Sequence, residues 1–267
     1  MRAAPWLLAA LAVSRLAGAE QAGKGVAPAY SAASLVNSAN NLAGALAPNT
    51  IVTLYGENLA YQTRAVSPGD LSQGRLPTTL TGTGVRVLVQ NIPAGIYYVS
   101  PNQINLLIPG ELLPGPARLQ VIQDGRAGPE VQIRLRRAAP ALYQLDANTA
   151  IAVRAGGGLA TAEAPARPGE VIVLYATGLG EVVPPLAAGE IPRGAASLKR
   201  LSEFAVLLDG LAIEASNILY AGVTPGFAGL YQINLRLPAT TGSNPEVRLA
   251  VGEECSPPGV RLAVESN

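Results

Sequence analysis

The sequence predicts an all-β protein built from two tandem β-sandwich domains. Three observations carry this prediction: runs in which apolar and polar residues alternate, abundant turn residues between the runs, and two phrases that each occur twice. The chain has 267 residues, of which 29 are Gly and 22 are Pro, and it shows no amphipathic helix after its first nineteen residues. Short strands joined by many turns are the structure that such a composition favours.

Residues 1–19 have the layout of a secretory signal peptide. A positive start at Arg2 precedes an apolar stretch at 7–13, and small residues end the segment before Glu20, where we expect cleavage. The apolar stretch is shorter than the roughly 20 helical residues that cross a bilayer. We therefore expect a mature chain without an integral membrane segment, either secreted or held in the periplasm or at the cell surface. A retained N-terminal anchor is the alternative, and residues 20–28 are expected to form a flexible lead-in.

Charge and composition exclude several classes of partner and of chemistry. Removal of residues 1–19 takes away Arg2 and Arg15, so 17 basic residues (19 − 2) remain against 18 acidic ones. Scattered charges close to neutrality argue against nucleic acid or an anionic membrane as the partner. The chain has no His and one Cys, which removes imidazole metal sites, His-dependent nucleophiles and any intrachain disulfide.

A duplication predicts the domain organisation. The phrase "IVTLYGENLA" at 51–60 returns as "VIVLYATGLG" at 171–180, and Gln-Ile-Asn-Leu at 103–106 returns at 232–235. The two offsets are 171 − 51 = 120 and 232 − 103 = 129 residues. A near-constant offset indicates a repeated unit with some nine residues inserted in the second copy. We predict domain 1 over residues 29–137 and domain 2 over residues 138–267, each the size of an ordinary domain.

Each copy reads as a series of strands. In domain 2, apolar residues at 231, 233, 235 and 237 alternate with Gln232, Asn234 and Arg236. This period of two is typical of a strand with one buried face and one wet face. Asp124-Gly125 and Asp209-Gly210 are signals for tight hairpins. Further strands are predicted at 84–91, 117–125 and 130–137 in domain 1, and at 204–213, 246–252 and 259–265 in domain 2.

Six phrases of the sequence occur in an order that a known family shares. They are "SAASLVNSAN", "LAPNTIVTLYGENLA", "LPTTL", "YYVSPNQINLLIP", "ARPGEVIVLYATGLG" and "AGVTPGFAGLYQINLRLP", and they run from about Tyr30 to the C-terminus. In these phrases the chain resembles the Solibacter C-terminal domain of secreted acidobacterial proteins. Each half also resembles, more loosely, the IPT/TIG immunoglobulin-like fold. The resemblance implies tandem immunoglobulin-like β-sandwiches, and it brings no established activity and no catalytic residues.

The catalytic candidates are few. A Ser-Lys arrangement would have to use Lys24 or Lys199, and "SLKRLS" at 197–202 reads as a polar loop, where an amine lacks the burial that activates it. Glu253 and Glu254 would point to opposite faces of a strand, and they fit a turn better. The Gly-rich runs 81–84 and 156–158 lack the features of a phosphate loop and read as turns, and the acidic residues form no calcium-loop pattern. We predict a protein that is not an enzyme and needs no cofactor or metal.

Matching strands supply the candidate ligand-binding residues. The paired amides Gln103/Asn105 and Gln232/Asn234 are expected on wet faces, where they either bind sugar hydroxyls or a peptide edge, or bond to neighbouring groups and fix strand register. The second interpretation is favoured, because most side-chain hydrogen bonds go to backbone or water. Tyr97 and Tyr98 are strand neighbours, so we expect them on opposite faces with one ring exposed. Tyr55 and Tyr175 occupy matching positions and are expected in the core or at a corner.

Two long loops and one cysteine complete the list of candidates. Residues 60–79 and 181–203 follow the same strand in each copy, so they should emerge at equivalent ends of the two sandwiches. Loops of this length are either functional or disordered. Cys255 lies in a predicted turn, and a buried, inert thiol is favoured over an intermolecular disulfide.

These observations predict an exported, non-catalytic interaction or structural module of the cell envelope or extracellular space. Its partner would be a protein or a polysaccharide. A carbohydrate-binding protein associated with polysaccharide use is the alternative function.

Overall fold

The computed structural model describes residues 25–265, so the predicted signal peptide and the first residues of the lead-in lie outside the described residues. Within that range the regular elements are strands β1 to β21 and four single-turn 3-10 helices, and the predicted all-β class is confirmed. None of the described residues belongs to a helix long and apolar enough to cross a membrane. The 3-10 helices are η1 (Ala32–Ser34), η2 (Pro68–Asp70), η3 (Leu201–Glu203) and η4 (Ala215–Asn217).

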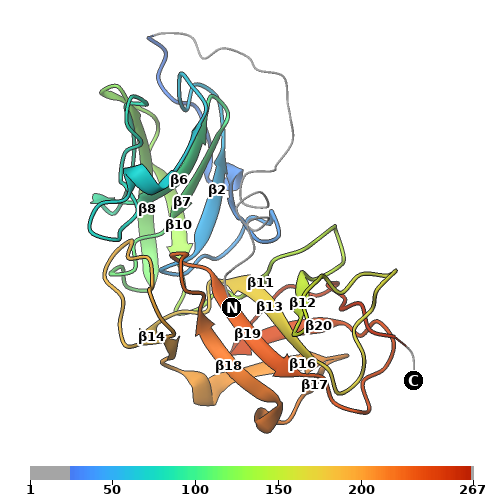
Figure 1. Ribbon diagram of the computed structural model, residues 1–267. Coiled ribbons are helices and arrows are strands. Elements are labelled where there is room, and N and C mark those ends of the chain that lie inside the picture. The colour runs from blue at the N-terminus through green and yellow to red at the C-terminus, as the bar shows by residue number, and fades with distance from the viewer. Residues whose placement is uncertain (1–24, 266–267) are drawn as a thin grey trace.

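Domain 1 is a sandwich of two antiparallel sheets, drawn in blue to green in Figure 1. One sheet has the strand order β1-β2-β7-β6-β3, and the other has the order β10-β8-β4-β5 with β9 paired to β8. The apolar core takes residues from both sheets, for example Leu54, Ile104 and Val87. The strands are β1 (Leu35–Asn37), β2 (Ile51–Tyr55), β3 (Arg64–Ala65), β4 (Val85–Val89), β5 (Ile92–Pro93), β6 (Gly95–Ser100), β7 (Gln103–Leu107), β8 (Gly115–Gln123), β9 (Arg126–Ala127) and β10 (Val131–Leu135).

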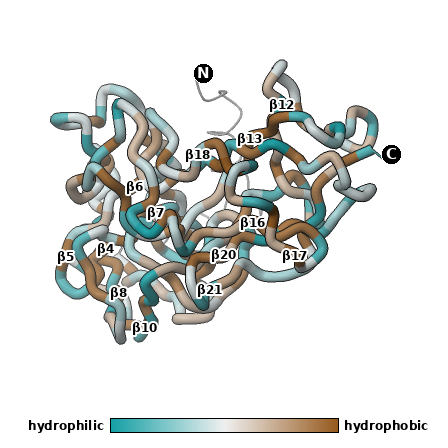
Figure 2. The backbone as a smooth tube through the Cα atoms, turned by 90° about the horizontal axis from the view of Figure 1, so that it is seen from below, coloured by the Kyte–Doolittle hydropathy of each residue, from teal (hydrophilic) through white to brown (hydrophobic). Residues whose placement is uncertain are grey.

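Domain 2 is a second sandwich, drawn in yellow to red in Figure 1. Its larger sheet has the order β11-β13-β19-β18-β15-β14 with β12 paired to β13, and its smaller sheet has the order β17-β16-β20-β21. Figure 2 shows that hydrophobic stretches follow the strands, whereas hydrophilic stretches gather in turns and loops at the periphery. The strands are β11 (Ala141–Leu142), β12 (Ala152–Arg154), β13 (Val171–Thr177), β14 (Val182–Val183), β15 (Ser197–Leu198), β16 (Phe204–Leu208), β17 (Leu211–Ala212), β18 (Ile218–Val223), β19 (Tyr231–Arg236), β20 (Val247–Val251) and β21 (Glu254–Cys255).

The duplication extends to the register of the strands. Leu54 of β2 is opposite Leu35 of β1 and Ile104 of β7, just as Leu174 of β13 is opposite Ala152 of β12 and Ile233 of β19. Both copies also carry a β-bulge at the same place, after Ile96 in β6 and after Ile218 in β18. The predicted pair of tandem immunoglobulin-like β-sandwiches is therefore confirmed.

Most of the predicted turns and strands agree with the structure. Asp124-Gly125 joins β8 to β9 and Asp209-Gly210 joins β16 to β17, and all four residues have positive φ, as tight hairpins require. The strand predicted at 259–265 is wrong, because this segment makes only isolated bridges at Arg261 and Val264. Its neighbours change within a few residues, so no continuous ladder forms. The predicted segments 84–91, 117–125, 130–137, 204–213 and 246–252 overlap strands β4, β8, β10, β16 with β17, and β20.

Candidate functional site

A third apolar core joins the two domains. Ile51 and Leu107 lie on the outer face of the first sheet of domain 1, because their strand neighbours point into the core of that domain. They pack with Tyr143, Val173 and Tyr175 of domain 2. Docking of this kind explains why every residue of β7 is buried, whereas the matching strand β19 alternates between buried positions and positions that are partly or fully exposed.

Tyr97 and Tyr98 both lie on this outer face, so the prediction that they face opposite ways is wrong. Their neighbours Ile96 and Val99 both point into the core of domain 1, and the bulge in β6 absorbs the extra residue. Tyr97 is 6% exposed, and its hydroxyl donates a hydrogen bond to the carbonyl oxygen of Ala228 at 2.6 Å. Burial raises the pKa of Tyr97. Tyr98 is half-buried.

The two amide pairs differ in their surroundings. The expected wet face is wrong for Gln103 and Asn105, which are 5% and 1% exposed because the outer face of β7 is covered. Gln232 and Asn234 in domain 2 are half-buried. In each pair the Gln Nε2 donates to the Asn Oδ1, at 2.8 Å in domain 1 and 3.3 Å in domain 2. These bonds agree with the interpretation that the amides bond to neighbouring groups.

Most of the inserted residues form the hairpin that docks domain 2 onto domain 1. Ser100 and Gln103 pair with two residues between them, whereas the matching Gly222 and Gln232 have nine between them, so seven residues (9 − 2) are inserted here. Within this hairpin, Ala228 and Leu230 are buried in the third core. The hairpin between β18 and β19 therefore makes contacts that the short hairpin of domain 1 is not long enough to make.

The two long loops meet each other across the domain boundary. The amide of Leu76 donates to the carbonyl of Gly189 at 2.9 Å, and the amide of Ile191 donates to the carbonyl of Gly74 at 2.8 Å. Leu76 and Ile191 also pack in the third core. Of the two alternatives for these loops, the structure therefore favours ordered loops that join the domains.

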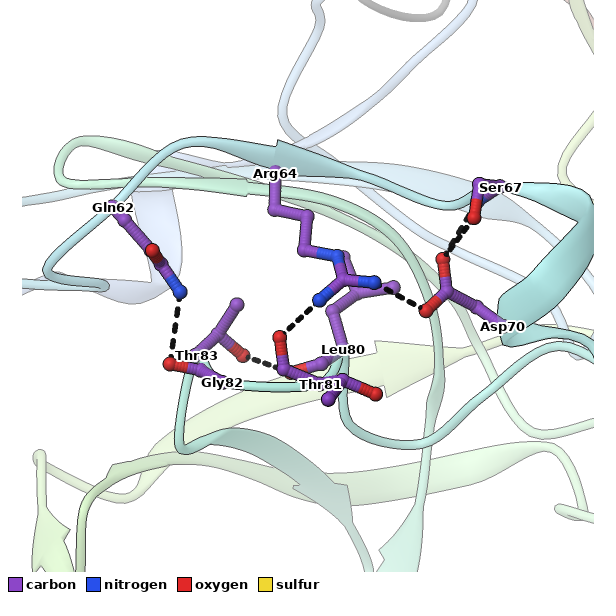
Figure 3. A network of polar contacts seen from close by, with 8 residues as sticks. All are labelled: Gln62, Arg64, Ser67, Asp70, Leu80, Thr81, Gly82 and Thr83. Atoms are coloured by element: carbon purple, nitrogen blue, oxygen red, sulfur yellow. Dashed lines mark hydrogen bonds and ion pairs between the residues drawn. The ribbon is translucent and has the colours of Figure 1, made fainter.

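Asp70 organises the first of these loops (Figure 3). Its carboxylate accepts hydrogen bonds from the amide and hydroxyl of Ser67 at 2.9 and 2.6 Å, and it pairs with Arg64 at 2.6 Å. Arg64 also donates to the carbonyl of Thr81. The hydrogen bonds from Ser67, together with the charge of Arg64, lower the pKa of Asp70.

Three adjoining hollows run along the domain boundary beside the third core, and we call them together the junction groove. The central hollow has a volume of about 380 Å³ and is lined by residues of both domains, among them Leu113 and Leu179. A hollow of about 740 Å³ shares Arg137 and Arg200 with it, and one of about 360 Å³ shares Lys199. The groove is therefore continuous and exists only where the two domains meet.

Three of the five cations along the groove have carboxylate partners. Lys199 pairs with Glu181 at 2.6 Å, Arg136 pairs with Glu254 at 2.5 Å, and the Nε of Arg200 pairs with Glu203 at 2.8 Å. The bond from Arg200, with smaller contributions from its charge and that of Arg137, lowers the pKa of Glu203. The side chains of Arg134 and Arg137 make no ion pair or hydrogen bond within residues 25–265.

The groove was not predicted from the sequence, although two signals for it are visible. Leu112 and Leu113 form an apolar pair in a loop, and three arginines cluster at 134–137. A third signal marks the docked face: Leu107 stands at the wet position of its strand, where the matching residue of domain 2 is Arg236. An apolar residue at a wet position indicates that something covers it.

The remaining candidates from the sequence form no catalytic or metal-binding arrangement within residues 25–265. Lys199 is exposed and lacks the burial that an activated lysine needs. Glu253 lies in the predicted turn, but the turn prediction is wrong for Glu254 and Cys255, which form β21. The Gly-rich runs 81–84 and 156–158 form turns and bends, as predicted. Residues 25–265 hold no group of three or more Cys, Asp or Glu placed to bind a metal ion. Cys255 is exposed and unpaired, so the favoured interpretation of a buried thiol is wrong.

No protein-family model matches the sequence, and no curated protein does. Among solved structures, the chain is similar to a surface glycan-binding protein of the Bacteroides ovatus mixed-linkage glucan utilization locus, with a TM-score of 0.35 and 12% identity over 84% of this chain and 44% of that one. A surface glycan-binding protein of Prevotella bryantii gives a TM-score of 0.29 and 10% identity over 88% and 42%. The tandem Ig repeats of Dlar give a TM-score of 0.21 and 9% identity over 91% of this chain and 97% of that one. This chain spans less than half the length of the two glycan-binding proteins, and the likenesses are too distant to indicate what it binds.

Proposed function

We propose that this chain is an exported, non-catalytic interaction module of the cell envelope or extracellular space, and that its partner is a protein. The observation that carries the proposal is the third core, in which Tyr97 and Leu107 of domain 1 pack with Val173 and Leu230 of domain 2. Two domains held this way present one preformed surface. Binding to a preformed surface costs less ordering than binding to two domains on a flexible linker.

The residue chemistry and the sequence support the same proposal. The signal-peptide layout of residues 1–19 supports export, and the resemblance to the Solibacter C-terminal domain supports a place among secreted proteins. The exposed groove along the junction combines apolar side chains with charges, a composition that suits protein recognition.

Carbohydrate binding is the second candidate, and one observation favours it. The outer face of domain 2 stays partly open, with the amides of Gln232 and Asn234 half-buried and able to donate to and accept from sugar hydroxyls. The position that matches Tyr97, however, holds Leu219, which is 51% exposed. A leucine in place of a ring offers no stacking platform for a sugar, so we rank this function second.

The test is a binding screen with purified residues 20–267. A glycan array and a polysaccharide pull-down are run beside a peptide array, with folding checked by circular dichroism. Glycan binding that is lost in a Gln232→Ala/Asn234→Ala variant and kept in Gln132→Ala, an exposed amide on β10, would replace the proposal with the carbohydrate function. A folded chain that binds peptides and no glycan supports the proposal, and one that binds neither contradicts it.

A further inference from the structure

We propose that the junction groove binds an extended peptide segment in which carboxylates are interspersed with apolar side chains. This inference rests on the proposed function and names the partner chemistry of the same molecule.

The shape of the groove fits a chain better than a compact ligand. The central hollow shares Arg137 and Arg200 with one neighbouring hollow and Asn49 and Lys199 with the other. The three hollows therefore follow one another along the boundary between the domains. An extended peptide can occupy such a row of hollows with successive side chains.

The central hollow has apolar side chains between its charged ones. Leu112, Leu113, Leu179 and Val251 line the central hollow, and they come from both domains. Leu179 and Val251 are buried, whereas Leu113 is 82% exposed and Leu112 is half-buried, so these two neighbouring leucines supply most of the apolar surface that is open to solvent. Apolar side chains of a bound segment would remove this surface from water, which is the main driving force for association.

The positive charges that line the junction groove favour acidic residues in the bound peptide. Glu181, Glu203 and Glu254 already neutralise three of the cations in the groove. Arg134 and Arg137 form no direct ion pair within the described chain, although the charge of Arg137 also acts on Glu203, and Glu253 is the one carboxylate of the groove lining without an ion pair in that range. The unpaired charges therefore leave an excess of one positive charge, carried by guanidinium groups that can hold a carboxylate through two parallel hydrogen bonds.

A peptide is favoured over an acidic polysaccharide by the kind of surface between these charges. None of the residues that line the three hollows is aromatic. Sugar rings pack best on flat aromatic faces, whereas leucine and valine side chains complement one another in irregular hollows.

The experiment measures the binding of defined probes to purified residues 20–267 by fluorescence anisotropy. The probes are labelled ten-residue peptides that alternate Asp with Leu, Lys with Leu, and Asp with Ser, together with labelled oligogalacturonate. We expect the Asp/Leu peptide to bind best and to bind more weakly as salt screens the charges. An Arg134→Glu/Arg137→Glu variant should weaken this binding roughly tenfold, from about 0.7 kcal/mol at each exposed contact.

A matched variant separates the groove from general electrostatics. Arg86→Glu/Arg126→Glu makes the same change in net charge at exposed arginines that line none of the three hollows. Equal weakening in both variants, equal binding of the Lys/Leu peptide, or binding of oligogalacturonate alone would overturn the inference. If the double variant unfolds, Arg137→Gln replaces it, with an expected weakening of about threefold.

The two proposals fail in different ways. If the chain binds none of the four probes but binds other sequences on the peptide array, the groove inference is overturned and the proposed function is still supported. A chain that binds no peptide on the array overturns both.

Discussion

The hydroxyl of Tyr97 in domain 1 donates a hydrogen bond to the carbonyl oxygen of Ala228 in domain 2 at 2.6 Å. The residue sits at a β-bulge, and the carbonyl sits in the inserted hairpin of the second repeat. The bond therefore joins a feature that both repeats share to one that only the second possesses. It is one of several hydrogen bonds that join the two domains.

Tyr97→Phe should lower the free energy of unfolding by about 1–2 kcal/mol, because the carbonyl of Ala228 would stay buried without its donor. Urea denaturation measures the change as a shift in midpoint. Tyr98→Phe is the control, since the hydroxyl of Tyr98 makes no hydrogen bond within residues 25–265. Equal shifts in the two variants would contradict the role of the Tyr97 bond.

Gly229→Ala should destabilise the junction far more than Gly226→Ala, although both glycines lie in one hairpin with positive φ. A Cβ on Gly229 would lie 2.3 Å from Cδ1 of Leu107 and 2.7 Å from the carbonyl oxygen of Asn49, whereas one on Gly226 meets nothing within 4 Å. Backbone strain alone costs about 1–2 kcal/mol in either variant, and overpacking at Gly229 adds about 1–3 kcal/mol. Limited proteolysis and urea unfolding should rank the variants in this order, and similar values for both would refute the docked position of the hairpin.

Tyr97→Ala and Leu219→Ala truncate side chains at the same bulge position of the two repeats. Tyr97 is buried in the third core, so its truncation should cost about 3–5 kcal/mol. Leu219 is 51% exposed, so its truncation should change stability by no more than about 0.5 kcal/mol. Thermal unfolding measures both, and comparable losses would mean that the two faces are covered alike.

Asp70→Asn should release the loop at 60–79, because the amide cannot accept all the bonds that Ser67 and Arg64 donate to the carboxylate. The expected result is faster proteolytic cleavage within this loop. Glu214→Gln, an exposed carboxylate of domain 2, serves as the control and should leave the cleavage rate unchanged.

Acid should have the same effect on that loop. The pKa of Asp70 is lowered in the folded chain, so its stabilisation is complete above the ordinary aspartate pKa of about 3.9 and is lost as the pH falls through the folded value. Cleavage of the wild-type loop by an acid-active protease should therefore accelerate only below about pH 4. Acceleration already at neutral pH would contradict this account.

Cys255 should react with a thiol reagent in the folded chain, because it is exposed and unpaired. The expected result is one modified thiol per chain without denaturant. Cys255→Ser should abolish the reaction and leave the urea midpoint unchanged. A thiol that reacts only after unfolding would show that the residue is covered.

The sequence predicted the strands and the hairpins well, because they depend on local periodicity and on the residues of the turns. Alternation of apolar and polar residues located strands such as β4 and β20, and Asp124-Gly125 and Asp209-Gly210 located two hairpins. The offset between repeated phrases revealed the second sandwich and the size of its insertion. These signals are reliable because each depends on the conformation of a few adjacent residues.

The candidate site was predicted less well, because burial of a strand position also depends on what docks against the sheet. Gln103 and Gln232 occupy the same place in their repeats, yet one is 5% exposed and the other is half-buried. The bulge at Tyr97 places two neighbouring tyrosines on the same face of the sheet. The alternation of apolar and polar residues in the sequence does not predict this bulge.

By itself, the sequence determined the all-β class, the duplication and most of the strands, since alternation and glycine-rich turns act within each repeat. Only the tertiary structure decided which outer face is covered, how the loops at 60–79 and 181–203 meet, and where the groove lies. The physical reason is that these features arise from contacts between residues more than a hundred positions apart, such as Tyr97 and Ala228. Alternation of apolar and polar residues indicates which residues share a face of a sheet. It does not indicate which outer face a second domain covers.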